Sequence, residues 1–556
     1  MRLLTAAAMA LGLFAAPAMA AEAPLMTVLI KPSKMSEAAG GMVDLTITVP
    51  AMDVAAGQPL FALPTMAPNM PSPQPREDLT ITDAEGAVPL VSYTPTTSDP
   101  WTASRRVHGD VTVRYKLPID NARGSGPPIN LRVDGDGFSG PGRMLLAVPQ
   151  TDAPYRVALK WDLAAMGPGA VGISSYGDGD VLVPAGKPAR LTRVMFMAGH
   201  AMREPADGGS SFSASWLAEP PFDPRPMLQW TGELHSWMSK FFRDEDEPPY
   251  RVFIRANPVN PGGGVAMHQA FMVGYGEGTT AEGLKSILGH EMTHTWTSTG
   301  EALGKWYAEG NAVYYQALLP WRAGLITTDQ YLFDLNRVAS RYYTNPKKHA
   351  SEAEAVARFW DDGFVRVLPY DRGAMYFAVL NGKVKRASAG KRSIDDLIRA
   401  MIDLERKDQP VSEAIWLDML RAEIGEEGPR IHAAMMSGEG LMLPESDDFG
   451  PCFRRITRKI RVFEPGFDIS GMANGRARIV RDLKPGSEAA KAGLLEGDAI
   501  VKAPLGDGAQ RDHERPVTVQ VTREGKPLSF TYMPRGEEVD AYQWERVAGV
   551  PEDKCR

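Results

Sequence analysis

Alternating apolar and polar residues dominate the first third of the chain. The clearest stretches are MVDLTITVP, VTVRYKL and YRVALKWDL, at residues 42–50, 111–117 and 155–163. A period of two buries one face of a β-strand, and segments rich in proline and glycine separate these stretches. The pattern predicts an N-terminal β-domain over residues 21–190, folded as a β-sandwich or an open β-barrel.

After residue 190 the apolar residues follow helical spacing, and this pattern continues to about residue 450. The segment predicts one helix, one strand, a glycine-rich strand and then two further helices, at residues 225–242, 250–258, 262–276, 280–298 and 303–320. We therefore expect a second, mainly α-helical domain over residues 191–450.

The last segment, residues 451–556, is again rich in β-forming residues. The stretch RARIVRDLKPGSEAAKAGLLEGDAIVKAP, at 476–504, predicts a strand, a Pro-Gly turn, a short helix and a second strand. Pro485 to Ile500 resembles the matching segment of PDZ domains, and the resemblance extends over residues 455–540. It implies a groove that binds peptide C-termini as an added strand. The alternative is a module of this shape that only packs against the rest of the protein.

The composition is that of a soluble globular protein, with 44% hydrophobic and 23% charged residues. The formal net charge is −7 and no basic run is present, so nucleic acid is not an expected partner. Residues 1–20 combine Arg2, an apolar stretch and the sequence Ala18-Met19-Ala20, which predicts a cleaved signal peptide rather than a membrane anchor. No later segment predicts a membrane span. We expect a periplasmic or secreted protein.

The chain contains two cysteines, Cys452 and Cys555. An even number in an oxidising compartment suggests a disulfide, here between the start of the last domain and the end of the chain. Two free buried thiols are the alternative.

Residues 290–294 read HEMTH, and the chain has only nine histidines. Side chains four residues apart lie on one face of a helix, so His290 and His294 can hold one metal ion. Neutral imidazole suits Zn²⁺. Glu291 points elsewhere on the helix and can act as the base for a water on the metal. The alternative is a histidine pair without a metal.

A catalytic zinc site generally has three protein ligands and one open position. Glu309, within KWYAEGNAVYY at 305–315, is the candidate third ligand. A second helix, packed antiparallel to the first, would present it to the histidines. Its neighbours are largely apolar and aromatic, where an unpaired carboxylate is unfavourable. We therefore expect one Zn²⁺ per chain.

These motifs resemble a known family. HExxH followed by W-x-x-E-G-x-x-x-Y-Y, here Trp306 to Tyr315, is similar to the gluzincin zinc metallopeptidases, and most similar to the glycyl-aminopeptidase family. Trp296 also matches. The resemblance implies a multidomain α+β protein with an N-terminal β-sandwich, a thermolysin-like, mainly α-helical catalytic domain and a C-terminal PDZ domain.

The stretch LPYDRGAM, at 368–375, resembles the Y-x-K-G-A segment of the aminopeptidase N family. The tyrosine of that segment donates a hydrogen bond to the tetrahedral oxyanion, so the resemblance implies this role for Tyr370. Arg372 stands in place of the lysine. The alternative is a tyrosine that only packs at a helix start.

One feature of the related enzymes is missing. They carry a glycine-rich segment followed by an acidic residue that binds the free amine of the substrate, but GGGVAMHQ, at 262–269, has Met267 at that position. Gly264, Met267 and His268 remain candidate substrate contacts on an edge strand, and Glu277 is a candidate replacement for the acid. The departure leaves hydrolysis intact but weakens the prediction of a strict aminopeptidase.

These features predict zinc-dependent hydrolysis of peptide bonds, by an aminopeptidase that acts on peptides with small N-terminal residues. Glu291 and Tyr370 are the expected catalytic residues. Two alternatives remain: an endopeptidase, and a non-catalytic periplasmic scaffold whose PDZ domain binds peptides.

Overall fold

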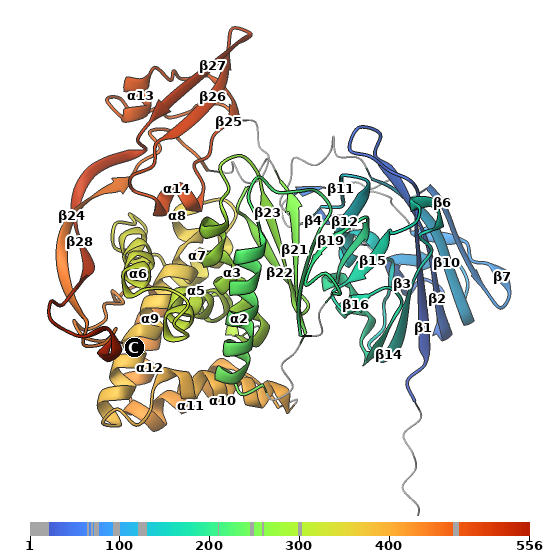
Figure 1. Cartoon of the computed structure of the whole chain (residues 1–556), viewed down its shortest axis with the longest axis horizontal. Helices are drawn as coiled ribbons and strands as arrows, with labels where there is room; N and C mark the ends of the chain where they lie inside the picture. Colours follow the sequence, from blue (N-terminus) through green and yellow to red (C-terminus); the bar gives the residue numbers. More distant parts are fainter. Residues whose placement is uncertain are drawn as a thin grey trace, which may run out of the picture.

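The structure is a computed structural model of the chain. It describes residues 22–555 except for the segments 64–65, 68–69, 72–76, 93–99, 120–129, 209–210, 245–248, 258–260, 298–302, 408 and 471–477. The signal peptide predicted for residues 1–20 lies outside the described residues. Figure 1 shows a β-rich N-terminal part, a helical central part and a C-terminal part that extends from the central helices.

Three sheets enclose the apolar core of the N-terminal part. The largest has seven strands, in the order β17 (Val181–Gly186), β14 (Tyr155–Trp161), β1 (Leu25–Pro32), β2 (Gly41–Val54), β10 (Val107–Ile119), β6 (Glu77–Asp83) and β7 (Gly86–Ala87). Alternate residues of β10 are buried, among them Val111, Val113 and Tyr115. The alternation seen in the sequence therefore separates the core face of this sheet from its other face.

The two smaller sheets contain four and five strands. The four-stranded sheet has the order β13 (Val148–Pro149), β3 (Pro59–Ala62), β9 (Trp101–Ala103) and β8 (Leu90–Ser92). The five-stranded sheet has the order β11 (Arg132–Asp134), β12 (Gly137–Pro141), β18 (Met195–Gly199), β15 (Val171–Ser174) and β16 (Gly177–Asp178). The N-terminal sheets thus run past the predicted boundary at residue 190. The alternation signal missed β18 because every residue of this strand is buried.

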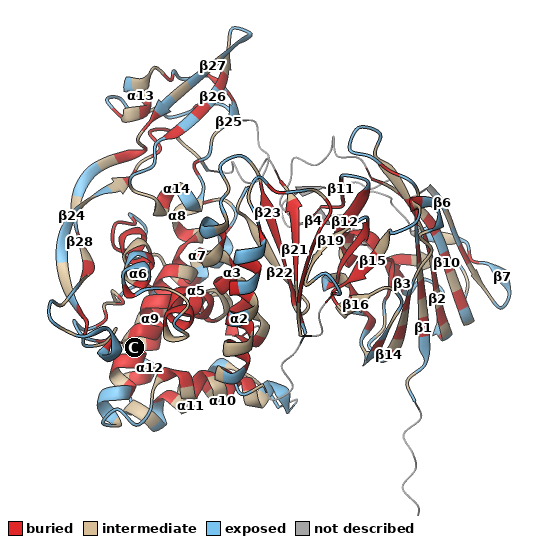
Figure 2. Ribbon diagram, viewed as in Figure 1, coloured by how far each residue is buried: buried red, intermediate tan, exposed pale blue. Residues whose placement is uncertain are grey.

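The central part has one five-stranded sheet, in the order β19 (Met202–Glu204), β20 (Phe212–Trp216), β21 (Tyr250–Ala256), β23 (Ala270–Tyr275) and β22 (Gly264–Met267). β22 is therefore an edge strand, as predicted. The main helices are α2 (Arg225–Phe241), α3 (Ala281–Thr297), α5 (Lys305–Arg322), α6 (Thr328–Tyr343), α9 (Leu368–Ala387), α10 (Ile394–Arg406), α11 (Glu413–Ile424) and α12 (Glu427–Ser437). Figure 2 shows α5 and α9 largely buried at the centre of this bundle. None of the described helices is long and apolar enough to cross a membrane.

The N-terminal and central parts are packed against each other. Met195 and Met197 of β18 share an apolar cluster with Phe253 of β21 and Met272 of β23. The buried Arg255 guanidinium donates hydrogen bonds across the same boundary to two backbone carbonyls of the N-terminal part, at 2.5 and 3.3 Å. This contact fixes the N-terminal part beside the central sheet.

Residues 451–556 were predicted to form a PDZ domain, resembling others over 455–540, and a C-terminal tail, but the structure divides this segment into a ribbon and a module. β24 (Phe453–Phe463) and β28 (Arg535–Arg546) form an antiparallel ribbon. Its base, with the disulfide between Cys452 and Cys555, belongs to the apolar core of the central part. The disulfide is the one suggested by the cysteine count.

A smaller module lies between the two ribbon strands and has its own core. It contains α13 (Glu488–Ala492), β25 (Ala499–Lys502), α14 (Asp507–Arg511), β26 (Val517–Arg523) and β27 (Lys526–Tyr532). The ribbon leads the chain away from the central core and back to it, and α14 of the module lies next to the central helices (Figure 1).

Candidate metal centre

α3 presents two histidines on one face. His290 and His294 are one turn apart, and their ring centroids are separated by 5.1 Å. Leu288 and Met292 of the same helix are fully buried in the central core, which fixes the orientation of the helix. Trp296 adds a hydrogen bond of 2.9 Å from its indole nitrogen to Asp244. The histidine face is therefore held toward α5.

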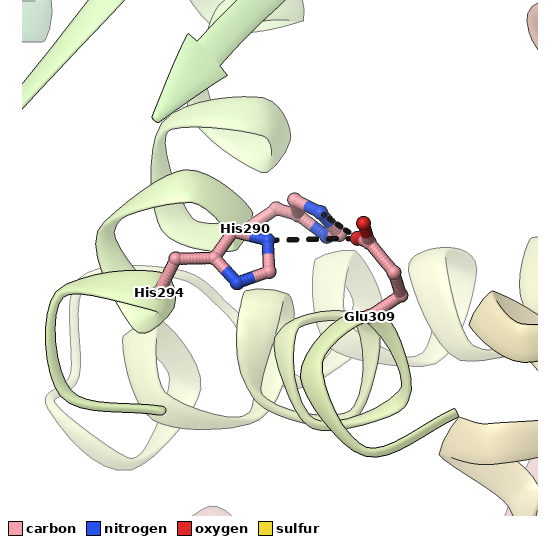
Figure 3. A group of neighbouring side chains, drawn as sticks. All are labelled: His290, His294 and Glu309. Atoms are coloured by element: carbon pink, nitrogen blue, oxygen red, sulfur yellow. Dashed lines mark ion pairs between the residues drawn. The ribbon is translucent and has the colours of Figure 1, made fainter. Parts of the chain in front are cut away.

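Glu309 of α5 lies opposite both rings, as Figure 3 shows. Its Oε2 atom is 3.4 Å from Nε2 of His290 and 3.5 Å from Nε2 of His294. One ligand atom from each of the three residues lies within 4.8 Å of the other two. Bond lengths of about 2.1 Å in a tetrahedral zinc site place ligand atoms about 3.4 Å apart. The spacing of these three side chains therefore fits a zinc ion.

Two glycines allow the helices to approach closely enough for this geometry. Gly289 precedes His290, and a Cβ atom added to it would lie 2.5 Å from the backbone oxygen of Gln316 in α5. Gly310 follows Glu309, and an added Cβ would lie 2.8 Å from the Cα atom of Gly373 in α9. Because a side chain at either position would push the helices apart, the glycines set the distances between the three ligand-bearing residues.

The charges in this group are interdependent. Burial would raise the pKa of Glu309, but the hydrogen bonds from His290 and His294 and the charges of these two residues together outweigh it and hold the pKa well below its usual value. Burial would likewise lower the pKa of His294, while its bond with Glu309 raises it. The side chains of His290, His294 and Glu309 are 11%, 13% and 19% exposed, so a cation can still reach them. An ionised carboxylate beside two imidazoles is a typical zinc donor set.

Glu291 and Tyr370 line the same cavity as the three ligand residues, and its volume is about 880 Å³. The Tyr370 ring, at the start of α9, is nearly parallel to that of His290 with centroids 6.1 Å apart. Burial, followed by the charge of Glu309, raises the pKa of Tyr370 well above its usual value. Its phenol therefore stays protonated at neutral pH and is available as a hydrogen-bond donor.

Arg372 is not part of this cavity. Its guanidinium is fully buried, pairs with Glu352 at 2.8 Å and donates to the backbone oxygen of Ala350. Asp371 pairs in the same way with Arg341 of α6, at 2.6 Å. The two residues after Tyr370 therefore anchor α9 to its neighbours and position the tyrosine.

The three predicted substrate contacts are not all in the cavity. Gly264 lines it, together with Val265 and Ala266 of the edge strand β22. Met267 and His268 do not, because β22 ends there and the chain turns toward the N-terminal part. The His268 amide donates to the backbone oxygen of Arg193 at 2.9 Å, and its ring lies 5.0 Å from that of Tyr176. These two predictions need correction.

Glu277, the candidate replacement for the missing acid, is exposed beyond the end of β23 and does not line the cavity. Sequence reasoning missed several residues that do. Arg193 comes from the N-terminal part, and Arg341 and Arg366 come from central helices. Asp507 and Arg511 come from α14 in the C-terminal module. No motif marks these five positions, because only the packing of three distant segments brings them together.

Comparisons with known proteins agree with this chemistry. Residues 298–367, which include Glu309, match the family model described as M61 glycyl aminopeptidase. The comparison with curated proteins finds no match.

Among solved structures, an aminopeptidase N family protein from Idiomarina loihiensis aligns with a TM-score of 0.63 and 13% identity, over 95% of this chain and 99% of that one. It shares the arrangement of a β-rich N-terminal part and a helical part. An M1 zinc metallopeptidase from Deinococcus radiodurans aligns with a TM-score of 0.44 and 14% identity, over 76% of this chain and 96% of that one. The family match around Glu309 and a side-chain group that fits zinc together indicate that the chain is a zinc peptidase.

Proposed function

We propose that this zinc peptidase is an aminopeptidase that acts on peptides with small N-terminal residues. The observation that carries the proposal is the convergence of His290, His294 and Glu309 in a cavity that also contains Glu291 and Tyr370. The preference for small residues rests on the resemblance to the glycyl-aminopeptidase family and on the family match.

A zinc ion bound by His290, His294 and Glu309 would polarise the scissile carbonyl and acidify the attacking water. Glu291, which is not among the three ligand residues, takes a proton from that water and delivers it to the leaving amine. Tyr370 donates its phenolic hydrogen to the carbonyl oxygen as negative charge develops there. Gly264 and its neighbours in the edge strand β22 offer backbone groups to an extended peptide.

An endopeptidase is the second candidate, and the lining of the cavity favours it. The carboxylates that line the cavity, among the described residues, are Glu291, Glu309 and Asp507. The first two belong to the catalytic group, and Asp507 pairs with Arg366 at 3.1 Å. No described carboxylate of the cavity is therefore free to bind a substrate amine.

The location and the C-terminal module are also proposals. We propose a periplasmic or secreted protein, since residues 1–20 resemble a signal peptide and a disulfide is typical of oxidising compartments. We further propose that the C-terminal module is PDZ-like and binds peptide C-termini. A scaffold that lacks catalysis would use this module alone.

The test compares peptides of one sequence with free and acetylated N-termini, and with Gly, Ala, Leu or Phe in first position. Mass spectrometry identifies the cuts made by the zinc-loaded protein. We expect stepwise removal of Gly and Ala from free N-termini, with acetylated peptides left intact. Internal cuts in both forms would identify an endopeptidase instead.

Two variants of α3 control this experiment. Glu291→Gln should retain zinc and lose turnover, whereas Glu282→Gln, at an exposed position of the same helix, should behave as the unmodified protein. Full activity of a clean Glu291→Gln preparation would remove Glu291 from its role. Absence of cleavage in every preparation would favour the scaffold.

A further inference from the structure

The C-terminal module supplies part of the wall of the cavity. Asp507, Gly508 and Arg511 of α14 line it alongside the catalytic group. α14 lies against the central helices near α8 (Gly363–Arg366) (Figure 1).

Three contacts hold α14 there. Asp507 pairs with Arg366 at 3.1 Å, Arg341 donates to the backbone oxygen of Asp507 at 3.3 Å, and Gln510 donates to the backbone oxygen of Gly363 at 3.1 Å. The module is therefore part of the site rather than a distant appendage.

Positive charge exceeds negative charge around this cavity. Its described lining has three carboxylates and five cationic side chains, the latter being Arg193, Lys305, Arg341, Arg366 and Arg511. Arg341 is neutralised by Asp371, and Arg366 by Asp507. The carboxylates of Glu291 and Glu309 belong to the catalytic group, so the remaining surface attracts an anion.

Arg511 is the cation that α14 contributes without a partner of its own. No described carboxylate forms an ion pair with its guanidinium, and Asp334 and Asp371 act on it only at a distance. Both are already engaged, Asp334 by Gln316 at 2.7 Å and Asp371 by Arg341. Arg511 is partly exposed, and burial lowers its pKa to about 10, so the guanidinium stays charged at neutral pH. A partly buried charge that lines a cavity without an ion-pair partner gains from an anionic ligand there.

We propose that Arg511 binds a carboxylate of the peptide substrate, so that the C-terminal module selects what the catalytic group cleaves. A guanidinium can hold a carboxylate through two parallel hydrogen bonds. The carboxylate is either the C-terminus of a short peptide or an Asp or Glu side chain. This inference rests on the proposed function, since it concerns the substrate of the same site.

The experiment measures binding separately from turnover. The zinc-loaded Glu291→Gln protein is titrated by calorimetry with three tripeptides: neutral with an amidated C-terminus, neutral with a free C-terminus, and amidated with a glutamate. We expect at least one carboxylate peptide to bind about tenfold more tightly than the neutral amide, as for a charge-assisted hydrogen bond. The free C-terminus and the glutamate peptide distinguish the two sources.

Arg511→Gln, added to this protein, should abolish the difference while leaving the affinity for the neutral amide unchanged. Arg511→Lys should restore part of it. Arg481→Gln, at an exposed position of the same module, is the matched control and should change nothing.

Equal affinities for all three peptides would overturn the proposal, whether or not Arg511→Gln folds. If Arg193→Gln abolishes the preference for carboxylate peptides and Arg511→Gln does not, the carboxylate site does not belong to α14, and the proposal is overturned. Failure of turnover in the unmodified protein would contradict only the proposed function.

Discussion

Gly310 of α5 packs directly against Gly373 of α9, so closely that a Cβ atom on Gly310 would lie 2.8 Å from the Cα atom of Gly373. Gly310 follows the metal-binding candidate Glu309, and Gly373 lies one turn after the start of α9, where Tyr370 is found. This contact therefore couples the position of the carboxylate to that of the phenol.

Gly310→Ala should separate the two helices and displace Glu309 from the histidines. Overpacking of this kind reduces the free energy of unfolding by about 1–3 kcal/mol. We also expect weaker zinc binding, measured by competition with a chelator. Gly506→Ala is the control, because a Cβ atom there meets no neighbour within 4 Å. Unchanged zinc affinity and stability in Gly310→Ala would show that the contact does not set the ligand geometry.

Tyr370→Phe should lower kcat about 100-fold or more and alter KM much less, as expected for loss of a donor that acts in the transition state. Steady-state kinetics on one peptide provides the measurement. Tyr542→Phe, on the ribbon away from the cavity, should have no effect. An increase in KM with unchanged kcat would make Tyr370 a binding residue.

Removal of the disulfide should destabilise the attachment of the C-terminal segment. Cys452 and Cys555 are separated by 103 residues and enclose the ribbon and the module. A crosslink across a loop of this length stabilises a fold by about 2–5 kcal/mol. The double variant Cys452→Ser, Cys555→Ser should unfold at lower denaturant concentration than the unmodified protein. Coincident unfolding curves would contradict this expectation.

Acid should destabilise the C-terminal module through His513. Burial, and then the charge of Arg535, lowers the pKa of His513 to about 4 in the folded chain, against about 6.5 when unfolded. The unfolded state thus binds more protons, so this contribution to stability is present above pH 6.5 and is lost as the pH falls toward 4.

Hydrogen exchange of β26 and β27 at pH 7 and 4.5 measures this effect. The exchange rates are first corrected for the intrinsic effect of pH. On acidification from pH 7 to 4.5, the backbone amides of the unmodified protein should then lose more protection than those of His513→Gln. Titrating carboxylates contribute equally to both proteins. The same loss in both would exclude His513 as the cause.

The strongest local patterns in the sequence predicted the fold best. The alternation in β10 and the spacing of His290 and His294 on α3 depend on neighbouring residues only. The edge position of β22 was also expected from its glycines. Strand β18 was missed because a strand buried on both faces shows no alternation.

Features built by distant segments had no signal in the sequence. The C-terminal segment divides into a ribbon and a module because Phe453 and Trp544 pack in the core of the central part, which no local pattern reveals. The role of Arg372 as an anchor depends on Glu352, and the placement of Arg511 depends on the return of the chain to the central helices. Met267 and His268 were predicted from their position after the glycine-rich segment, but β22 ends at Met267 and neither residue lines the cavity.

Zinc content tests the central claim most directly, namely that His290, His294 and Glu309 hold one zinc ion. After loading and dialysis, metal analysis should find about one zinc per chain in the unmodified protein and in Glu291→Gln, but far less in His294→Ala and in Glu309→Ala. Retention of a full equivalent of zinc by Glu309→Ala, or its absence from the unmodified protein, would contradict the account.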